Sequence, residues 1–276
     1  MRDSKEIIMT ALNKARNAYL GLVKEGKAGI EKCIGAFGDT STMGDLVTEE
    51  VIINSISSEL RDVSFVTEER GIIGDIKNTR YRVLIDPIDG STNMKRGIRF
   101  FSSGIALFEG INYSDIVAAG VIDIPNGQIY FANRTNIHID NDVSSPSDVN
   151  RLEKAIVSLD FRPLKKEKEF IEPFLKLCQK IRYVRNFGSS LLDICQIVTG
   201  KIDAFVCLTP ELRLFDLVPA LFILERVGGC WVIDKPGFIL TEPMIKERYA
   251  VIAASNNQLL EEIINFTSIN WNNKSD

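Results

Sequence analysis

Two aspartates one turn apart are the residues of this sequence that most clearly suggest chemistry. They are Asp86 and Asp89, in a run Asp-Pro-Ile-Asp-Gly-Ser-Thr-Asn that ends at Asn93. The apolar run from Tyr81 to Ile85 predicts a buried strand, so Asp86 is expected to leave a sheet at its carboxyl edge. Asp89 is expected to return to the same place after a bend that Pro87 begins. Two carboxylates brought together by a turn favour a hard cation.

The three residues after this pair are suited to an anion. Gly90, Ser91 and Thr92 offer successive backbone amides in a glycine-containing turn, which is a concavity that fits a phosphate. The alternative is an ordinary junction of strand, turn and helix, in which Asp caps the helix and Gly supplies an unusual backbone angle. This motif alone does not decide between the two.

A second acidic pair, Glu68 and Glu69, favours the metal site. It follows the β-like run Val63 to Thr67, so a second strand also ends on carboxylates. Adjacent side chains of an extended segment point to opposite faces, and only one of the two can readily reach the metal. Glu68 is the expected ligand, and Glu69 is expected behind it or in a salt bridge.

These acidic motifs resemble those of the inositol monophosphatase family, which comprises lithium-sensitive, magnesium-dependent phosphatases, including fructose-1,6-bisphosphatases and nucleotide phosphatases. The resemblance covers nearly the whole chain and includes Asp216, within Leu212 to Ala220, and the segment Glu225 to Gly229. Phe215 and the pair Val218-Pro219 depart from the usual family pattern. A proline is tolerated in the first turn of a helix, so a helix is still expected to start near Asp216.

A further segment, Asp39 to Asp45, is similar to the family's Asp-x-Val-Thr-x-x-Asp and makes Asp45 the outer metal ligand. A rival register matches Asp45 to Thr48 and would put Val51 at the ligand position, where no metal could bind. Asp45 is preferred for that chemical reason. The alternative for Asp45 is the N-cap of a helix over Val47 to Leu60, and one residue can serve both roles.

The resemblance implies a ligand set and a mechanism. One Mg2+ is held by Asp86, Asp89 and Asp216, a second by Glu68, Asp86 and the Ile88 carbonyl, and a weaker third by Asp45. Ligands that are all oxygen favour Mg2+ or Mn2+ over zinc. Ser91 and Asp45, alongside Glu68, would orient and deprotonate the attacking water. Ser91 as a covalent nucleophile is the alternative, but it has no His or Lys base in a recognisable motif.

The substrate is expected to meet residues of both halves of the chain. The predicted contacts are Asp89, Gly90, Ser91, Thr92, Arg185, Gly188, Ser189, Arg213 and Asp216. Gly188 and Ser189 resemble a family segment at a helix start, and a plain helix cap is the alternative. Arg213 suits the second phosphate of a bisphosphate, with a surface salt bridge to Glu211 as the competing account. Lys165, Lys166 and Lys168 can add anion steering, although charge runs are more often merely solvated.

The predicted function is a Mg2+-dependent phosphomonoesterase that acts on inositol 1-phosphate, fructose 1,6-bisphosphate or both. The context of Arg213 and the run Gly97 to Phe101 resemble archaeal members with that dual activity. A nucleotide phosphatase acting on 3'-phosphoadenosine 5'-phosphate is the first alternative. A catalytically silent binding protein of the same fold is the second, and a Mg2+ phosphatase of another fold is a third.

Composition agrees with a compact enzyme. The chain has 276 residues, of which 45% are hydrophobic and 25% charged, enough for a large core. A net charge of -4 argues against a protein that coats nucleic acid. The N-terminal segment predicts an amphipathic helix and not a signal peptide, and no apolar stretch approaches the length of a membrane span. Five cysteines without metal-type spacing predict reduced, mostly buried thiols in the cytoplasm. The lone histidine, His138, is expected on the surface.

The elements around these motifs predict an α/β (α+β) protein. Residues 1–145 should form an α+β subdomain with a mixed, largely antiparallel sheet, and Asn133 to Asn150 should be the boundary loop. Residues 146–276 show an α/β alternation of strands and helices. The resemblance implies a layered αβαβα sandwich, metals between the halves, and a homodimer. The Gly- and Lys-rich segment Lys24 to Phe37 is either a flap that gates water or a set of passive turns.

Overall fold

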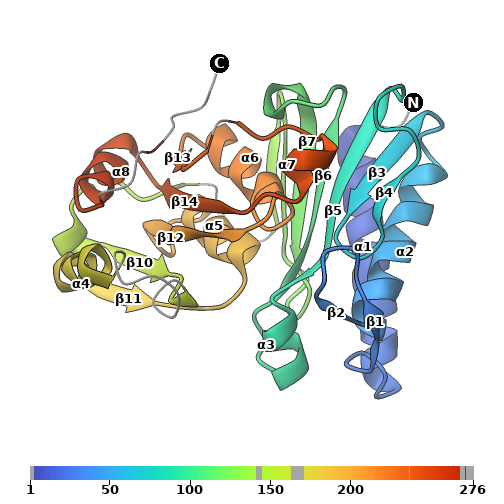
Figure 1. Ribbon diagram of the computed structural model, residues 1–276, viewed down its shortest axis with the longest axis horizontal. Helices are drawn as coiled ribbons and strands as arrows, with labels where there is room; N and C mark the ends of the chain where they lie inside the picture. Colours follow the sequence, from blue (N-terminus) through green and yellow to red (C-terminus); the bar gives the residue numbers. More distant parts are fainter. Residues whose placement is uncertain (1–2, 141–144, 163–170, 236, 268–270, 272–276) are drawn as a thin grey trace.

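The computed structural model describes residues 3–140, 145–162, 171–235, 237–267 and 271. Its helices and strands form five layers, which run from right to left in Figure 1. Helices α1 (Ser4–Lys24) and α2 (Met43–Ser57) cover one face of a seven-stranded sheet, and α5 (Ser190–Val198) and α6 (Val218–Arg226) cover the other. A five-stranded sheet follows, and α4 (Ile171–Lys180) and α8 (Asn257–Ile264) lie outside it. The predicted αβαβα sandwich is confirmed.

The seven-stranded sheet has the order β4-β3-β5-β6-β7-β8-β9 and only one parallel pair, β3 with β5. Its strands are β3 (Val63–Thr67), β4 (Gly71–Ile73), β5 (Tyr81–Asp89), β6 (Ser102–Phe108), β7 (Ile116–Asp123), β8 (Ile129–Asn133) and β9 (Ile137–Ile139). The prediction of a mixed, largely antiparallel sheet is therefore confirmed. The boundary loop predicted over Asn133 to Asn150 is wrong in part, because β9 lies inside it and pairs with β8.

The five-stranded sheet has the order β11-β10-β12-β14-β13. Its strands are β10 (Ile156–Leu159), β11 (Tyr183–Arg185), β12 (Ala204–Leu212), β13 (Cys230–Ile233) and β14 (Tyr249–Ala254). Short elements complete the described chain: β1 (Glu31–Ile34), β2 (Thr40–Thr42), α3 (Ser91–Arg96), α7 (Glu242–Ile245) and the 3-10 turns Tyr113–Asp115 and Leu152–Lys154. From β10 to α6 these elements follow the predicted alternation of strands and helices, whereas β13, β14 and α8 were not predicted.

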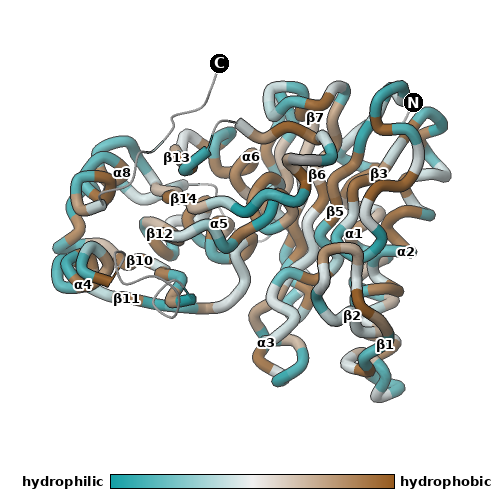
Figure 2. The backbone as a smooth tube through the Cα atoms, viewed as in Figure 1, coloured by the Kyte–Doolittle hydropathy of each residue, from teal (hydrophilic) through white to brown (hydrophobic). Residues whose placement is uncertain are grey.

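Hydrophobic packing explains why the layers stay together. The N-terminal helix α1 begins at its cap Asp3 and buries Ile8, Ala11 and Leu12 against the larger sheet, so the predicted amphipathic helix is confirmed. The middle core joins residues of both predicted subdomains, since α5 and α6 contact β6, β7 and β8 as well as the smaller sheet. In Figure 2 the hydrophobic colour follows the strands of the larger sheet, whereas α4 and α8 mix both colours.

The structure also tests the predictions made for His138, the cysteines, the flap and membrane-spanning segments. His138 lies on β9, partly exposed, with its Nε2 2.7 Å from Asp140. Only two of the five cysteines, Cys195 and Cys207, are buried, so the prediction of mostly buried thiols is wrong. The proposed flap contains β1, which pairs with β2 in a small antiparallel sheet. Within the described ranges, no helix is long and apolar enough to span a membrane.

Candidate active site

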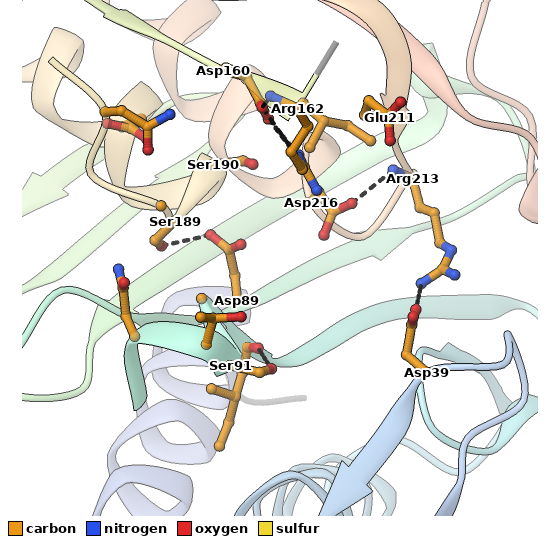
Figure 3. A pocket seen from close by; sticks show the side chains of 18 of the residues that line it. Asp39, Asp89, Ser91, Asp160, Arg162, Ser189, Ser190, Glu211, Arg213 and Asp216 are labelled. Carbon is orange, nitrogen blue, oxygen red and sulfur yellow. Dashed lines mark hydrogen bonds and ion pairs between the residues drawn. The ribbon is translucent and has the colours of Figure 1, made fainter. Parts of the chain in front are cut away.

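Three aspartates, two of them buried and the third partly exposed, meet where the larger sheet faces the middle helices. One carboxylate oxygen from each of Asp86, Asp89 and Asp216 lies within 4.8 Å of the other two. The first two belong to β5, and the third lies in the turn before α6, as Figure 3 shows for Asp89 and Asp216. The helix predicted to start near Asp216 begins two residues later, at Val218, with Pro219 in its first turn as expected. The site is therefore assembled from segments about 130 residues apart in the chain, which only the fold brings together.

A bulge in β5 places the first two aspartates on the same side. Asp86 lies opposite Gly104 of β6 and Asp89 opposite Ser102, so β5 has one residue more than β6 between these pairs. Because side chains alternate along a strand, residues three apart would normally face opposite sides, and the extra residue restores a common side. The prediction that Asp86 leaves the sheet is wrong. Pro87 lies inside the bulge, where its missing N–H breaks no ladder hydrogen bond.

The position of Glu68 follows from the register of β3. Thr67 lies opposite Ile85 in the parallel pair of β3 and β5, so the next residues, Glu68 and Asp86, lie side by side. Burial and the neighbouring Asp216 raise the pKa of Glu68 well above its ordinary value. Burial and the Glu68 charge do the same for the pKa of Asp86. The structure thus brings the four predicted carboxylates into one electrostatic unit.

The buried carboxylates have few hydrogen-bond donors. Neither Oδ1 nor Oδ2 of Asp86 has a hydrogen-bond partner among the described residues, although both are buried. Burial, followed by the charge of Asp216, raises the pKa of Asp89 to about 7. An unpaired buried charge is costly, whereas a divalent cation with oxygen ligands compensates several such charges at once. The residues present therefore fit a site for Mg2+ or Mn2+.

Each of the other two aspartates is held by backbone amides. Asp89 Oδ2 accepts hydrogen bonds from the Leu191 amide at 2.7 Å and from Ser189 Oγ at 2.6 Å, both at the start of α5. Asp216 Oδ2 accepts one from the Arg213 amide at 2.7 Å. These contacts oppose the effect of burial on the two pKa values and fix the carboxylates in place.

Asp45 is buried at the start of α2 and has one unused oxygen. Its Oδ2 accepts hydrogen bonds from the Thr42 amide and hydroxyl, both at 2.7 Å, while Oδ1 is buried without a partner. Thr42 is the N-cap and Asp45 is the third residue of the helix, so the N-cap alternative for Asp45 is wrong. Burial raises the pKa of Asp45. Its charge is felt by Glu68 and Asp86, which agrees with an outer position in the site.

Ser91 and Ile88 lie next to each other. Ser91 is the first residue of α3, and its Oγ donates a hydrogen bond to the Ile88 carbonyl at 3.0 Å, the carbonyl predicted to bind metal. The described hydrogen bonds of Ser91 do not include the predicted pair with Asp45. Gly90, at φ 92°, is the N-cap of α3, so the chain passes from β5 into a helix as in the alternative, although no side chain caps that helix. Gly90 and the first two helical residues, Ser91 and Thr92, line the cavity.

Glu69 does not form the salt bridge that was one of the two alternatives given for it. Its Oε2 makes a very short contact with Ser41 Oγ, and its amide donates to Glu49 Oε2 at 3.0 Å. Burial, with the nearby charges of Asp45 and Glu49, raises the pKa of Glu69 to about 7. No salt bridge of Glu69 is found among the described residues. The side chain instead joins β2 to the segment that follows β3 and carries Glu68.

A cavity of about 630 Å3 opens over these residues and is lined by both halves of the chain. Most predicted site residues line it: Glu68, Ile88, Asp89, Gly90, Ser91, Thr92, Gly188, Ser189, Arg213 and Asp216. Arg185 does not. It is exposed on β11, where its Nη1 donates to the Val184 carbonyl and its guanidinium lies over the Tyr183 ring. The predicted substrate contact of Arg185 is therefore wrong for this arrangement.

The halves also approach each other closely beside the aspartates. A Cβ added to Gly90 would lie 3.1 Å from the Gly188 carbonyl oxygen and 3.2 Å from Ser189 Cβ, so the approach requires glycine. Asn93, buried at 8% exposure, donates from Nδ2 to the carbonyls of Phe100 at 2.7 Å and Phe187 at 2.6 Å. One amide group thus links α3 to the segment that leads into α5.

Arg213 binds within the site and not to Glu211. Its Nη1 lies 2.7 Å from Asp39 and 3.5 Å from Glu68, and its Nη2 donates to the Phe37 carbonyl at 3.1 Å. Figure 3 shows the guanidinium directed toward Asp39. The side chain is 7% exposed, so the surface salt bridge to Glu211 is wrong. A guanidinium with these partners has little capacity left for a second phosphate.

Other residues of the cavity were not singled out from the sequence. These are Asp39, Lys95, Asp160, Arg162, Asp193 and Arg248. Asp193 is 2% exposed with a partnerless Oδ1, and burial raises its pKa well above the ordinary value. Arg162 lies in the connection whose lysines were noted, but Lys165, Lys166 and Lys168 fall outside the described residues. Arg248 had no sequence signal, because no motif surrounds it.

Comparison with known proteins gives a consistent family. The model of the inositol monophosphatase family matches residues 3–270. A fructose-1,6-bisphosphatase/inositol-1-monophosphatase of Methanothermobacter thermautotrophicus is 26% identical over 94% of this chain and 95% of its own length. A bifunctional NADP phosphatase/NAD kinase of Methanococcus maripaludis is 26% identical over 86% of this chain, which corresponds to 44% of that larger protein.

Solved structures agree on the fold. A crystal structure named as an inositol monophosphatase-fructose 1,6 bisphosphatase superposes with a TM-score of 0.80, at 22% identity, over 96% of this chain and 100% of its own. At this level of identity the similarity concerns the fold, and the layers described above are those of that structure.

Proposed function

This chain belongs to the inositol monophosphatase family and is a phosphoric monoester hydrolase, and we propose that it uses bound Mg2+ to let water cleave a small phosphorylated substrate. One observation carries the proposal. The carboxylates of the buried Asp86 and Asp89 and the partly exposed Asp216 converge within 4.8 Å beside a cavity of about 630 Å3, and both oxygens of Asp86 lack a hydrogen-bond donor among the described residues. Such a set is suited to hold a divalent cation in contact with a phosphate.

The metal ligands proposed are those of the sequence prediction. Asp86, Asp89 and Asp216 would hold one ion, Glu68, Asp86 and the Ile88 carbonyl a second, and Asp45 a third, with Mg2+ preferred and Mn2+ as the alternative. When bound, the ions supply positive charge that polarises the phosphate and stabilises the leaving oxygen. The hydrogen bonds from Leu191 and Arg213 hold two of the carboxylates in position before any ion arrives.

The residues of the chain then act on water and substrate. Ser91 Oγ donates to the Ile88 carbonyl, which leaves its oxygen free to accept a hydrogen bond from the attacking water. The unused Oδ1 of Asp45 and the Glu68 carboxylate are the acceptors proposed for the proton of that water. Water attacks phosphorus, the ester P–O bond breaks, and the leaving oxygen takes up a proton. Amides of the Gly90 to Thr92 turn would contact the phosphate oxygens.

Inositol 1-phosphate and fructose 1,6-bisphosphate are the substrates we propose. The dual phosphatase from Methanothermobacter, which is similar over almost the whole chain, supports this choice. The relative with NADP phosphatase in its name favours a second candidate, a nucleotide phosphate such as 3'-phosphoadenosine 5'-phosphate or NADP. Both candidates share every metal ligand and differ in the part of the cavity that belongs to residues 146–276. Inhibition by lithium, a homodimer and a cytoplasmic location stay predictions.

Phosphate release from these four compounds tests the proposal. We expect release with Mg2+, loss of release with EDTA, and loss in the Asp86→Asn variant, whose side chain breaks no described hydrogen bond. Release from the inositol and fructose substrates above the nucleotides supports the dual activity, and the reverse order supports the second candidate. Folded protein that binds Mg2+ but hydrolyses none of them would favour a silent binding protein.

A further inference from the structure

Four cationic side chains line the cavity, and three of them are paired with carboxylates. The pairs are Lys95 with Glu31 at 3.1 Å, Arg162 with Asp160 at 2.9 Å, and Arg213 with Asp39 at 2.7 Å. Arg248 differs, because its described partner is neutral: its Nη1 donates to the Glu211 carbonyl at 2.7 Å. Among the described residues it is the cavity cation without a carboxylate within ion-pair distance.

The sheet fixes where this charge lies. Arg248 directly precedes β14, whose first residue Tyr249 lies opposite Leu212 at the end of β12. Arg248 therefore lies beside the loop that carries Arg213 and Asp216. One nitrogen is anchored to a backbone carbonyl, and the other donors of the planar group are not used by described residues.

We propose that Arg248 binds a second phosphate group of the substrate and so selects bisphosphorylated substrates over monophosphates. The inference rests on the proposed phosphatase function. A guanidinium without a counter-ion binds phosphate oxygens through paired N–H donors. A cavity of about 630 Å3 lies within the range of small-molecule sites and has room for a substrate that reaches both the aspartates and Arg248.

The other two arginines are poorer candidates for this role. Arg213 would have to give up Asp39 and the Phe37 carbonyl, and would leave Glu68 without its nearest cation. Arg162 is held by both carboxylate oxygens of Asp160 through its Nε. A substrate phosphate would compete with a carboxylate at either residue, whereas at Arg248 it meets an uncompensated charge.

Matched substrates test the proposal with the full chain and Mg2+. Fructose 1,6-bisphosphate is compared with fructose 1-phosphate and fructose 6-phosphate, which lack one phosphate each. Arg248→Gln is expected to lower kcat/KM for the bisphosphate by about 10- to 100-fold, the effect of a lost charge-assisted hydrogen bond, and to leave the monophosphates within about twofold. For Arg248→Lys we expect a kcat/KM for the bisphosphate between those of wild type and Arg248→Gln. An ammonium group keeps the positive charge but lacks the paired N–H donors of guanidinium.

Arg182→Gln is the control, since it removes the same charge from an exposed arginine outside the cavity, which lies over the Tyr183 ring. If this control matches Arg248→Gln, or if Arg248→Gln lowers all three substrates equally or none of them, the inference is wrong while the phosphatase proposal stands. If wild type hydrolyses no substrate, the proposed function fails and the inference fails with it. Should Arg248→Gln not fold, Arg248→Lys supports the same comparison.

Discussion

The two walls of the cavity differ in how their charged side chains are paired. On the wall of the larger sheet, Asp86 has two buried oxygens without donors, and Asp45 has one. On the wall of the smaller sheet, Arg162 is paired with Asp160, and Arg248 is anchored to a backbone carbonyl. The first wall leaves buried carboxylate oxygens that a bound cation can satisfy, whereas the second pairs one arginine with a carboxylate and leaves the other without a counter-ion. The first wall is therefore suited to hold the metal ions for the reaction, and the second to select the substrate.

Asp86→Asn breaks this contrast with the largest expected effect. Removing one buried charge should lower kcat by at least about 1000-fold, because the ligand shared by two proposed ions is lost. The same change should stabilise the metal-free protein, since it relieves repulsion with Glu68 and Asp89. Activity assays and thermal unfolding in EDTA measure the two effects. A variant that is both inactive and less stable would show that Asp86 supports the fold and not a cation.

The pH dependence of stability sharpens the same contrast. Burial and Asp216 raise the pKa of Asp89 to about 7, above the ordinary value near 3.8 of an unfolded chain. The folded state therefore binds this proton more tightly, and its contribution is present below about pH 4 and lost as pH rises through 7. In EDTA the melting temperature should fall between pH 5 and 8, and Mg2+ should restore it most at pH 8. An equal gain from Mg2+ at both pH values would contradict the account.

Arg213→Met tests the link between the walls and should have an intermediate effect. The guanidinium holds the β1–β2 segment through Asp39 and Phe37 and faces Glu68. Its loss should lower the free energy of unfolding by about 1–3 kcal/mol, since a buried side chain with three polar contacts is removed. Urea unfolding measures it. Asp39→Asn is the milder comparison, because Asp39 is exposed; equal losses in both variants would place the effect in the surface pair alone.

Asn93→Asp tests the contact between the halves with almost no change of shape. A carboxylate would face the Phe100 and Phe187 carbonyls, which now accept hydrogen bonds from the amide. We expect a loss of about 1–3 kcal/mol in stability and a weaker apparent affinity for Mg2+, because the start of α5 also holds Asp89. Asn93→Ala should cost less, since it adds no repulsion. Equal stability of wild type and Asn93→Asp would show that the Asn93 amide does not hold the two halves together.

Arg185→Gln should have the smallest effect. The side chain is exposed on β11 and lies outside the cavity, so kcat/KM should stay within about twofold of wild type and stability within about 0.5 kcal/mol. Steady-state kinetics with inositol 1-phosphate check this. A tenfold loss of kcat/KM would instead show that Arg185 contacts the substrate.

The sequence predicted the first wall far better than the second. Asp86 and Asp89 share one motif, Glu68 follows a readable strand, and their convergence needs only neighbouring strands. The bulge that brings Asp86 and Asp89 to one side could not be foreseen, because it depends on the pairing with β6. The layered fold was accessible through the resemblance of these motifs.

The second wall depends on contacts between distant segments. Arg213 was recognised as a cavity residue, but its partners Asp39 and Phe37 lie more than 170 positions away. Arg248 reaches the cavity only because β14 pairs with β12, and β14 was not predicted. Charges on such segments look like solvated surface in the sequence, and only the packed structure shows which of them are paired.

Calorimetric titration of Mg2+ into the metal-free protein, beside Asp86→Asn, tests the central claim most directly. The account predicts two to three bound ions in the wild type and loss of the tightest site in the variant, with release of protons near pH 7 as Mg2+ replaces them at the aspartates. Wild-type protein that binds no Mg2+, or a variant that binds it as tightly as the wild type, would contradict the claim that these buried carboxylates are a metal site.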